Sequence, residues 1–191
     1  MMRIITGMAK GVKLDAPAGL TTRPTSERAK EAVFSMLQFD IEGRRVLDLF
    51  AGSGQMGLEA LSRGAQSATL VDQSKEAVGV IRRNAERAKL EKKMILLNQD
   101  FRVYLNGKLG AAQPFDLVFL DPPYKQGLLT EALQLLATGG FLKPTSYVVC
   151  ESGAPGVLSE DPQLQEAYEV VKETKYGVAY VTILQSTGVE G

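Results

Sequence analysis

The repeated alternation of apolar runs with amphipathic segments constrains the fold of this chain more than any other feature. Short runs rich in Val, Leu and Ile recur from residue 45 onwards, and a segment with helical spacing follows most of them. The runs are continuously apolar, which is typical of strands that helices cover on both faces. Repeated strand–helix units join parallel strands through right-handed crossovers. The sequence therefore predicts an α/β protein with a mostly parallel sheet.

The two ends of the chain depart from this alternation. The repeating part is predicted to contain strands at 45–50, 67–72, 94–100, 115–124 and 146–152, and helices at 55–64, 74–90, 101–109 and 127–137. Residues 168–185 resemble two strands joined by a tight turn, which indicates a C-terminal antiparallel hairpin. Residues 3–17 resemble a second hairpin. We therefore expect an N-terminal β-hairpin extension at 1–24 and a main domain at 25–191, which opens with a helix after Thr25 or Ser26.

The amino-acid composition excludes several kinds of catalytic and binding site. The chain has 191 residues, which favours one compact domain with at most a small appendage. It contains one cysteine, Cys150, and no histidine, so an intrachain disulfide, a Ser–His or Cys–His nucleophile and a histidine metal site are excluded. We expect no metal. Since no apolar run approaches a membrane span and the first residues lack the features of a signal peptide, we expect a cytoplasmic protein away from membranes.

Positive charge is concentrated near the N-terminus. Lys and Arg balance Asp and Glu over the whole chain, but residues 1–30 carry a net charge of +4. The basic side chains there are Arg3, Lys10, Lys13, Arg23, Arg28 and Lys30. Such an arm favours a polyanionic partner, and a solvated surface strand is the alternative. Charge alone leaves both interpretations open.

A glycine-rich loop follows the first predicted strand of the main domain. Gly52, Gly54 and Gly57 have G-x-G-x-x-G spacing between a strand and a helix, which lets a ligand approach the backbone closely. Asp72 ends the next strand, twenty residues after Gly52, where a carboxylate would meet ribose hydroxyls. This pattern predicts a nucleoside site, and a simple tight turn is the alternative.

Asp48 distinguishes between nucleoside cofactors. It lies just before the glycine loop, where dinucleotide sites hold a pyrophosphate that a carboxylate would repel. S-adenosylmethionine carries a sulfonium and an ammonium instead, so we expect it and not NAD. Asp100 ends the third predicted strand and Phe101 follows it. Both could contact the adenine, although an N-cap and a core ring explain them equally well. Phe50 and Gln73 complete the expected cofactor-binding residues.

The segment Asp121-Pro122-Pro123-Tyr124 directly follows the apolar run at 115–120. Two prolines stop the strand and present a carboxylate, a free carbonyl and an aromatic ring at the ligand-binding edge of the sheet. A base drawn out of a nucleic acid could stack on Tyr124 and donate its amino hydrogens to Asp121 and the Pro122 carbonyl. These acceptors would orient the amino nitrogen toward a methyl donor. A rigid structural turn is the alternative.

These motifs carry a family resemblance. DLFAGSG followed by DPPY resembles the class I S-adenosylmethionine-dependent amino-methyltransferases. The stretches RIITG…KGVKL, TRPTSERAKEAVFSML and VLDLFAGSGQMGLEALSRGA resemble the RsmD-type 16S ribosomal RNA guanine-N2 methyltransferases of bacteria. This resemblance implies a Rossmann-like fold with a seven-stranded, mostly parallel sheet that ends in an antiparallel pair. It also implies methyl transfer to the 2-amino group of a guanine.

The resemblance also implies roles for individual residues. Asp48, Gly52 and Gly54 would form the donor loop, with Asp72 at the ribose, Asp100 at the adenine, and Asp121, Pro122 and Tyr124 at the target base. We expect a monomer whose partner is ribosomal RNA or a small-subunit particle. The residues expected to contact RNA are Arg3, Lys10, Arg23, Thr25 and Arg28.

Several rival functions remain at this point. DPPY also suits DNA adenine or cytosine methylation and protein glutamine methylation. The glycine loop alone suits an NAD(P)-dependent oxidoreductase, and the basic arm alone suits a non-catalytic RNA-binding assembly factor. The carboxylates Asp48, Asp72 and Asp121 taken together favour the methyltransferase.

Overall fold

The computed structural model describes residues 2–19, 24–107, 113–123 and 127–188, with the backbone alone for 24–26. The strands are β1 (Arg45–Asp48), β2 (Ser67–Asp72), β3 (Met94–Asn98), β4 (Phe115–Leu120), β5 (Leu142–Ser152), β6 (Tyr168–Tyr176) and β7 (Ala179–Ser186). The helices are α1 (Pro24–Met36), α2 (Gln55–Ser62), α3 (Lys75–Ala88), α4 (Phe101–Asn106), α5 (Leu128–Thr138) and α6 (Pro162–Ala167), and a 3-10 turn spans Glu91–Lys93.

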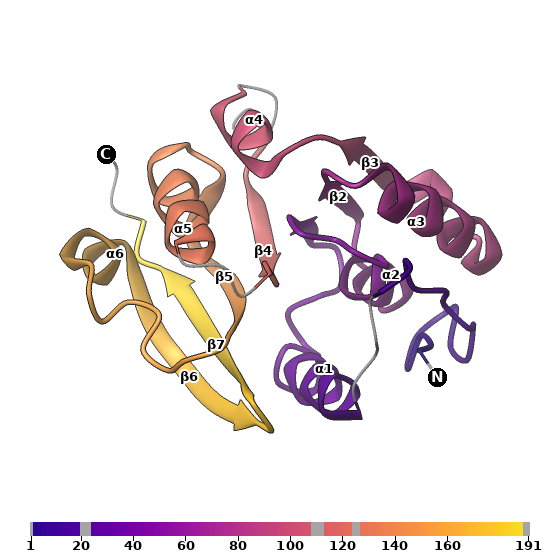
Figure 1. Ribbon diagram of the computed structural model, residues 1–191, viewed down its shortest axis with the longest axis horizontal. Helices are drawn as coiled ribbons and strands as arrows, with labels where there is room; N and C mark the ends of the chain where they lie inside the picture. Colours follow the sequence, from indigo (N-terminus) through magenta and orange to yellow (C-terminus); the bar gives the residue numbers. More distant parts are fainter. Residues whose placement is uncertain (1, 20–23, 108–112, 124–126, 189–191) are drawn as a thin grey trace.

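One seven-stranded sheet organises the molecule (Figure 1). Its strand order is β3-β2-β1-β4-β5-β7-β6, with β1 to β5 parallel and β7 antiparallel to both of its neighbours. The chain therefore moves outward from β1 to β3 and then returns to place β4 on the other side of β1. This reversal of strand order is where open α/β sheets bind ligands. The predicted fold class is confirmed.

Successive residues of the buried strands face opposite sides of the sheet, so each strand contributes to two cores. Val46 of β1 packs with residues of α1, α2 and α3, including Phe34, Leu58 and Ile81. Its neighbour Leu47 packs with residues of α4, α5 and α6, including Leu133. The continuously apolar strand sequences follow from this double burial. Cys150 is fully buried in the second core, and burial raises the pKa of its thiol.

Several element boundaries differ from the sequence-based predictions. The helix expected at 101–109 ends at Asn106. Strand β5 begins at Leu142, four residues before the predicted start at residue 146. Its register with β4 shifts there, and Thr145 adopts a left-handed conformation with φ of 71°. The short helix α6 was not predicted. It begins where the Asp161 carboxylate accepts hydrogen bonds from the amides of Gln163 and Leu164.

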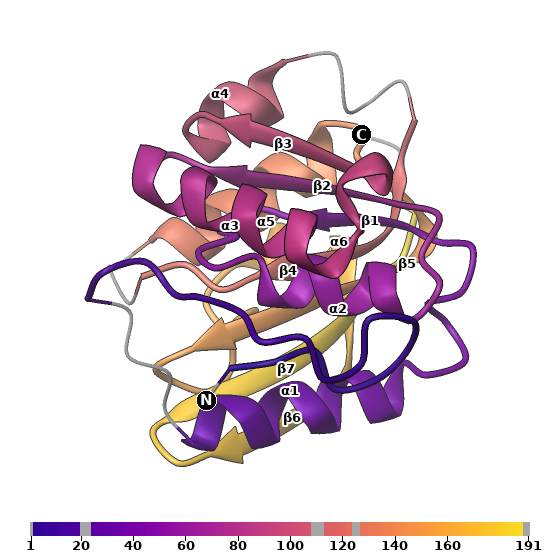
Figure 2. The ribbon, with the colours of Figure 1, turned by 90° about the vertical axis from the view of Figure 1, so that its right-hand side faces the viewer.

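The N-terminal segment, residues 2–19, lies across α2 and α3, and α1 lies along β6 and β7 (Figure 2). The expected hairpin consists of one antiparallel bridge between Arg3 and Lys13, flanked by backbone hydrogen bonds such as Ile4 to Val12. Its apolar side chains Met2, Ile4, Ala9 and Leu14 are buried in the core beneath α1 to α3. The segment is thus packed into the main domain.

Candidate active site

The glycine loop brings the end of β1 directly onto α2. Gly52 and Gly54 have positive φ values of 55° and 77°, a region that side chains rarely adopt, and Gly54 forms the N-cap of α2. A Cβ at Gly57 would lie 2.9 Å from the Leu70 side chain. The loop therefore needs glycine to turn sharply, and α2 needs it to pack closely on β2.

Asp72 ties this loop to the end of β2. One carboxylate oxygen accepts a hydrogen bond from the Gly52 amide at 2.8 Å, and the other accepts one from the Ser74 amide at 2.8 Å. Each oxygen retains a lone pair, so the expected ribose contact is compatible with this arrangement. Gln73 follows at the exposed edge, where the Asn98 side chain donates to its carbonyl.

Asp48 lies at the carboxyl end of β1 and is 3% exposed. Its carboxylate accepts a hydrogen bond from the Gly57 amide at 3.0 Å. Desolvation raises the pKa of Asp48 to about 7; the hydrogen bond from Gly57 opposes this shift and the negative charge of Asp72 adds to it. A cation bound in front of Asp48 would hold the carboxylate ionised, whereas a phosphate would be repelled.

Asp100 and Phe101 occupy the end of β3 and the start of α4. The Asp100 carboxylate caps α4 by accepting a hydrogen bond from the Arg102 amide at 2.8 Å. The Phe101 ring is buried against Phe50, with ring centroids 5.0 Å apart. The Arg102 guanidinium lies 4.5 Å from the Phe101 ring centroid and donates two hydrogen bonds to the Glu131 carboxylate. Asp100 is therefore an N-cap and Phe101 a core ring, which are the two structural alternatives given above. Contact of either residue with adenine stays a prediction.

The second motif begins where β4 ends at Leu120. Asp121 follows at an exposed position, and Pro122 is buried beneath the turn. Water reaches Asp121, yet enough protein surrounds its carboxyl group that desolvation is the largest cause of a pKa raised to about 7. The charges of Glu151 and then Asp48 raise this pKa further. Tyr124 lies outside the described residues.

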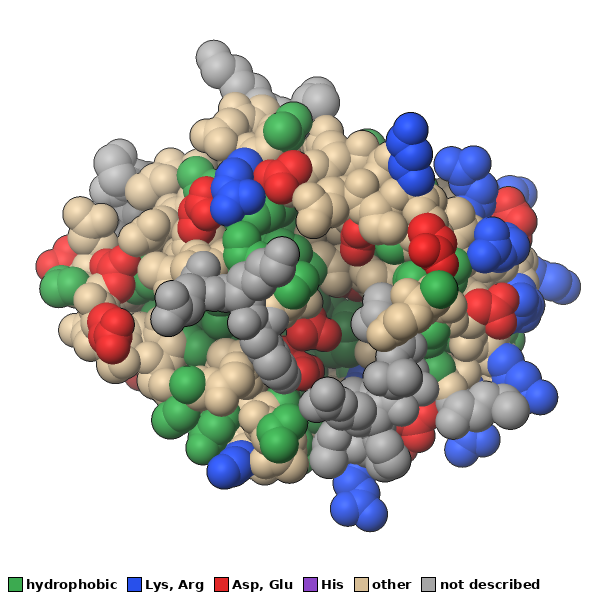
Figure 3. Space-filling view, viewed as in Figure 1, with side chains coloured by type: hydrophobic (Ala, Val, Ile, Leu, Met, Phe, Trp, Pro, Cys, Tyr) green, Lys and Arg blue, Asp and Glu red, His purple; other side chains and the backbone are tan. Residues whose placement is uncertain are grey.

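The ends of β1, β4 and β5 thus place Asp48 and Glu151 close enough to Asp121 for their charges to raise its pKa. Figure 3 shows acidic side chains at the rim of a hollow near the middle of this face. A cation or several N–H donors would relieve the repulsion between these groups. Across the described residues, no group of acidic or cysteine side chains is arranged to hold a metal ion.

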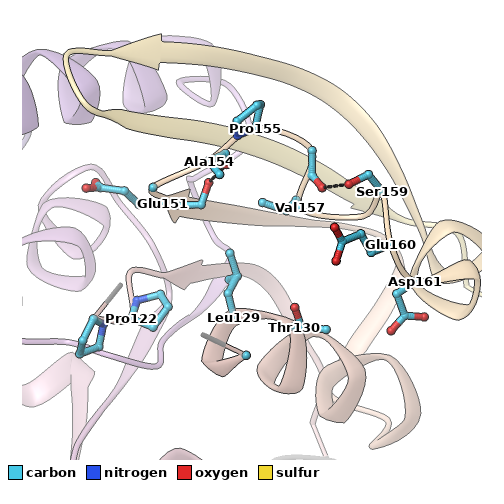
Figure 4. Close-up of a pocket in the computed structure, with 15 residues that line it drawn as sticks. Pro122, Leu129, Thr130, Glu151, Ala154, Pro155, Val157, Ser159, Glu160 and Asp161 are labelled. Carbon is cyan, nitrogen blue, oxygen red and sulfur yellow. Dashed lines mark hydrogen bonds between the residues drawn. The ribbon is translucent and has the colours of Figure 1, made fainter. Parts of the chain in front are cut away.

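A cavity of about 590 Å³ lies beside the Asp-Pro-Pro turn (Figure 4). It is bounded by Pro122 and Pro123, by the start of α5 and by residues 151–161. Its volume is in the range of pockets that hold small organic ligands. Sequence reasoning missed this cavity, because its walls come from three separate parts of the chain.

The residues expected to contact RNA are only partly described. Arg3, Lys10 and Arg28 are exposed, whereas Arg23 and the side chain of Thr25 lie outside the described residues. Lys30, which the charge count placed in the basic arm, is 3% exposed. Its ammonium donates to the Arg3 carbonyl at 2.9 Å and lies 3.6 Å from Glu59. Lys30 is therefore part of the core, and the exposed charge of the arm is smaller than counted.

Glu59 is a second residue that sequence reasoning missed. Its carboxylate is fully buried and accepts hydrogen bonds from the amides of Ile5 and Thr6 and from Arg63. A charged residue inside the apolar segment at 57–61 was the available signal. The stretch GLEALSRGA, which carried part of the family resemblance, thus fastens the N-terminal segment to α2.

The sheet order, the glycine loop after β1 and the Asp-Pro-Pro turn after β4 define a class I methyltransferase. Comparison with known proteins specifies the family. The model of the family described as "Conserved hypothetical protein 95" matches residues 2–185. The chain belongs to this family, which is the RsmD family.

Relatives cover nearly the whole chain. It is 36% identical to "Putative rRNA methyltransferase YlbH" of Bacillus subtilis, over 98% of this chain and 100% of the relative. It is 34% identical to "Ribosomal RNA small subunit methyltransferase D" of Haemophilus influenzae, over 97% of this chain and 94% of the relative. The structure of "Putative methyltransferase yhhF from Escherichia coli" superposes with a TM-score of 0.85 at 32% identity, covering 98% of both chains.

Proposed function

We propose that this protein transfers a methyl group from S-adenosylmethionine to the 2-amino group of a guanine in small-subunit ribosomal RNA. The observation that carries this proposal is the placement of Asp121 and Pro122 beside Asp48, where β1 and β4 meet at the point of strand reversal. Relatives named as ribosomal RNA methyltransferases support the reaction class and the RNA substrate. An NAD(P)-dependent oxidoreductase and a non-catalytic assembly factor fit neither the family nor this site.

The residues proposed to bind the methyl donor lie at or just after the ends of β1, β2 and β3. When bound, S-adenosylmethionine supplies an electrophilic methyl group on a positively charged sulfur. Asp48 provides a buried negative charge for the cationic part of this molecule, and Asp72 provides acceptors for its ribose. Phe50 and Phe101 provide the apolar wall expected for the adenine ring.

The residues proposed to bind the target base lie in the turn after β4. The Asp121 carboxylate and the Pro122 carbonyl would accept the two hydrogens of the 2-amino group and so direct the nitrogen lone pair toward the methyl carbon. The new N–C bond forms as the C–S bond breaks, and one amino proton must leave the nitrogen. Asp121 is placed to accept that proton, since its pKa is raised to about 7.

The deciding experiment follows labelled methyl groups from S-adenosylmethionine onto small-subunit particles that lack their natural methylations. Nucleoside analysis of the product should show N2-methylguanosine. Naked 16S RNA and particles from a fully methylated source are the matched substrates, and the latter should accept no label. Label in adenosine, cytidine or protein would contradict the proposed function. We also propose that the protein acts as a monomer in the cytoplasm.

A further inference from the structure

The end of β5 places a second acidic residue beside Asp121. Strands β4 and β5 are parallel and in register, with Leu120 opposite Cys150. Asp121 and Glu151 are the next residues along their strands, and neighbouring strands lie about 4.8 Å apart. These two carboxyl groups therefore leave the same edge of the sheet side by side.

Glu151 also belongs to the wall of the cavity beside the Asp-Pro-Pro turn. Figure 4 shows its side chain at the tip of β5, with the carboxylate pointing away from Glu160 and Asp161 on the far side of the cavity. Glu151 thus lines this cavity and also lies close enough to Asp121 for its charge to act on that carboxyl group. A base that presents its amino group to Asp121 would have its adjoining ring edge near Glu151.

The chemistry of the base edge distinguishes guanine at this position. In guanine, the ring nitrogen N1 next to the 2-amino group carries a hydrogen and donates. The ring nitrogen next to the amino group of adenine or cytosine carries a lone pair, which a carboxylate repels. Asp121 alone can recognise an amino group but cannot distinguish these bases. A second carboxylate that accepts from N1–H would make the distinction, because in a complex with adenine or cytosine it would face a lone pair instead of a donor.

We propose that Glu151 is the residue that selects guanine, by accepting a hydrogen bond from N1–H while Asp121 accepts one from the 2-amino group. This inference rests on the proposed function and adds to it the source of base selectivity. The charge of Glu151 contributes to the raised pKa of Asp121, which agrees with the adjacency of the two carboxylates that the strand register gives.

The test uses 2-aminopurine, which keeps the 2-amino group but has a lone pair at N1 in place of the hydrogen. Small-subunit particles are reconstituted with RNA that carries guanine or 2-aminopurine at the position that the wild-type protein methylates. The wild type should prefer guanine in kcat/KM. In Glu151→Gln the amide can donate to N1 of 2-aminopurine, so the preference for guanine should shrink by ~10–100-fold. 2-Aminopurine also lacks the O6 atom of guanine. This difference affects the wild type and Glu151→Gln alike, so it cancels when their preferences for guanine are compared.

Two further variants serve as controls. Glu160→Gln removes a carboxylate from the opposite wall of the same cavity and should leave the preference for guanine unchanged. Glu151→Asp keeps the charge on a shorter side chain, so activity should fall while the preference for guanine is retained. Binding of S-adenosylmethionine, measured by calorimetry, should be the same for Glu151→Gln and the wild type.

The outcomes separate this inference from the proposed function. Equal losses on guanine and 2-aminopurine in Glu151→Gln would show that Glu151 does not recognise N1. A weaker affinity for S-adenosylmethionine would assign Glu151 to the donor and overturn the inference. Either result leaves the proposed function standing if the wild type methylates guanine. A wild type that forms no N2-methylguanosine refutes the proposed function itself.

Discussion

At the scale of single residues, Asp121 is the group that the proposed function ties most directly to methyl transfer. Its carboxylate is exposed to an incoming base, while the Asp48 carboxylate is enclosed beneath the glycine loop. We therefore expect the two acids to face different ligands, although the charge of Asp48 contributes to the raised pKa of Asp121. This division predicts that substitutions at the two positions have different consequences.

Replacement of Asp121 should affect the reaction and leave donor binding intact. We expect Asp121→Ala to reduce the rate of methyl transfer by ~10²–10³-fold, by analogy with the loss of one charge-stabilising group in other enzymes. Single-turnover transfer and calorimetric binding of S-adenosylmethionine measure the two effects separately. A variant with wild-type turnover would show that Asp121 does not orient the amino group.

Replacement of Asp48 should instead change stability and donor affinity. The pKa of Asp48 is raised to about 7 in the folded protein, against ~4 in an unfolded chain. Between these values the folded state holds a proton that the unfolded state has lost, so the free energy of unfolding falls as pH rises. Asp48→Asn removes this penalty and can still accept from the Gly57 amide. It should be more stable than the wild type at pH ~8 by on the order of 1–3 kcal/mol, and no more stable at pH ~4.

Urea unfolding at several pH values measures this difference. Glu160→Gln is the matched control, because it removes one carboxylate at an exposed position. The same Asp48→Asn variant should bind S-adenosylmethionine more weakly. An unchanged pH profile of stability would mean that the Asp48 carboxylate is already ionised in the free folded protein at lower pH.

At the scale of elements, residues 2–19 are attached to α2 by the buried carboxylate of Glu59 and by hydrogen bonds with Ser62. Glu59 accepts from two amides of the segment and stands beside Lys30 of α1. Glu59→Gln leaves Lys30 without a compensating charge and turns an amide NH2 group toward a backbone donor. We expect a loss of ~3–5 kcal/mol in the free energy of unfolding, as is typical when one partner of a buried ion pair is removed.

Denaturant unfolding and amide hydrogen exchange measure this effect. Exchange should accelerate first at Ile5 and Thr6, because the single side-chain oxygen of glutamine cannot replace both oxygens that accept from these amides. Glu76→Gln is the control, since Glu76 accepts from the Ala18 amide at an exposed position and should cost under ~1 kcal/mol. Unchanged protection at Ile5 and Thr6 would show that the Arg3–Lys13 bridge holds the segment without Glu59.

The same segment is predicted to bind RNA through its exposed charges. Reversal of Arg3 and Lys10 to glutamate should weaken RNA binding across sequences and flatten its dependence on salt, because fewer counterions are released. Reversal of Lys92 and Lys93 is the matched control, since these lysines are exposed after α3. Parallel salt slopes and equal affinities for the arm variant and the wild type would remove the arm from the RNA site.

At the scale of the whole molecule, ligand binding should stabilise the sheet where its two halves meet. The donor is expected to contact the ends of β1, β2 and β3, so its binding resists unfolding of several elements together. S-adenosylmethionine at ~100 times its dissociation constant should raise the free energy of unfolding by ~2.7 kcal/mol. NAD at the same concentration should have little effect, because Asp48 repels its pyrophosphate. Equal shifts in Tm with the two ligands would refute this selectivity.

Features that depend on neighbouring residues were predictable from the sequence alone. The order of strands and helices follows from apolar spacing, and the glycine loop follows from the need for positive φ at Gly52 and Gly54. The turn at Asp121 follows from two prolines that cannot continue a strand. These local constraints, together with family resemblance, determined the fold class and the reaction class, and predicted the residues of the candidate site.

Only the tertiary structure determined which charged residues interact when they are distant from each other in the sequence. Lys30 and Glu59 are far apart in the chain, and nothing local distinguishes Lys30 from its exposed neighbours. Asp121 and Glu151 become adjacent solely through the register of β4 and β5. Burial and electrostatic coupling depend on what surrounds a group in space, so no pattern along the chain could assign them. The sequence thus determined which chemical groups are present, and packing determined which of them act together.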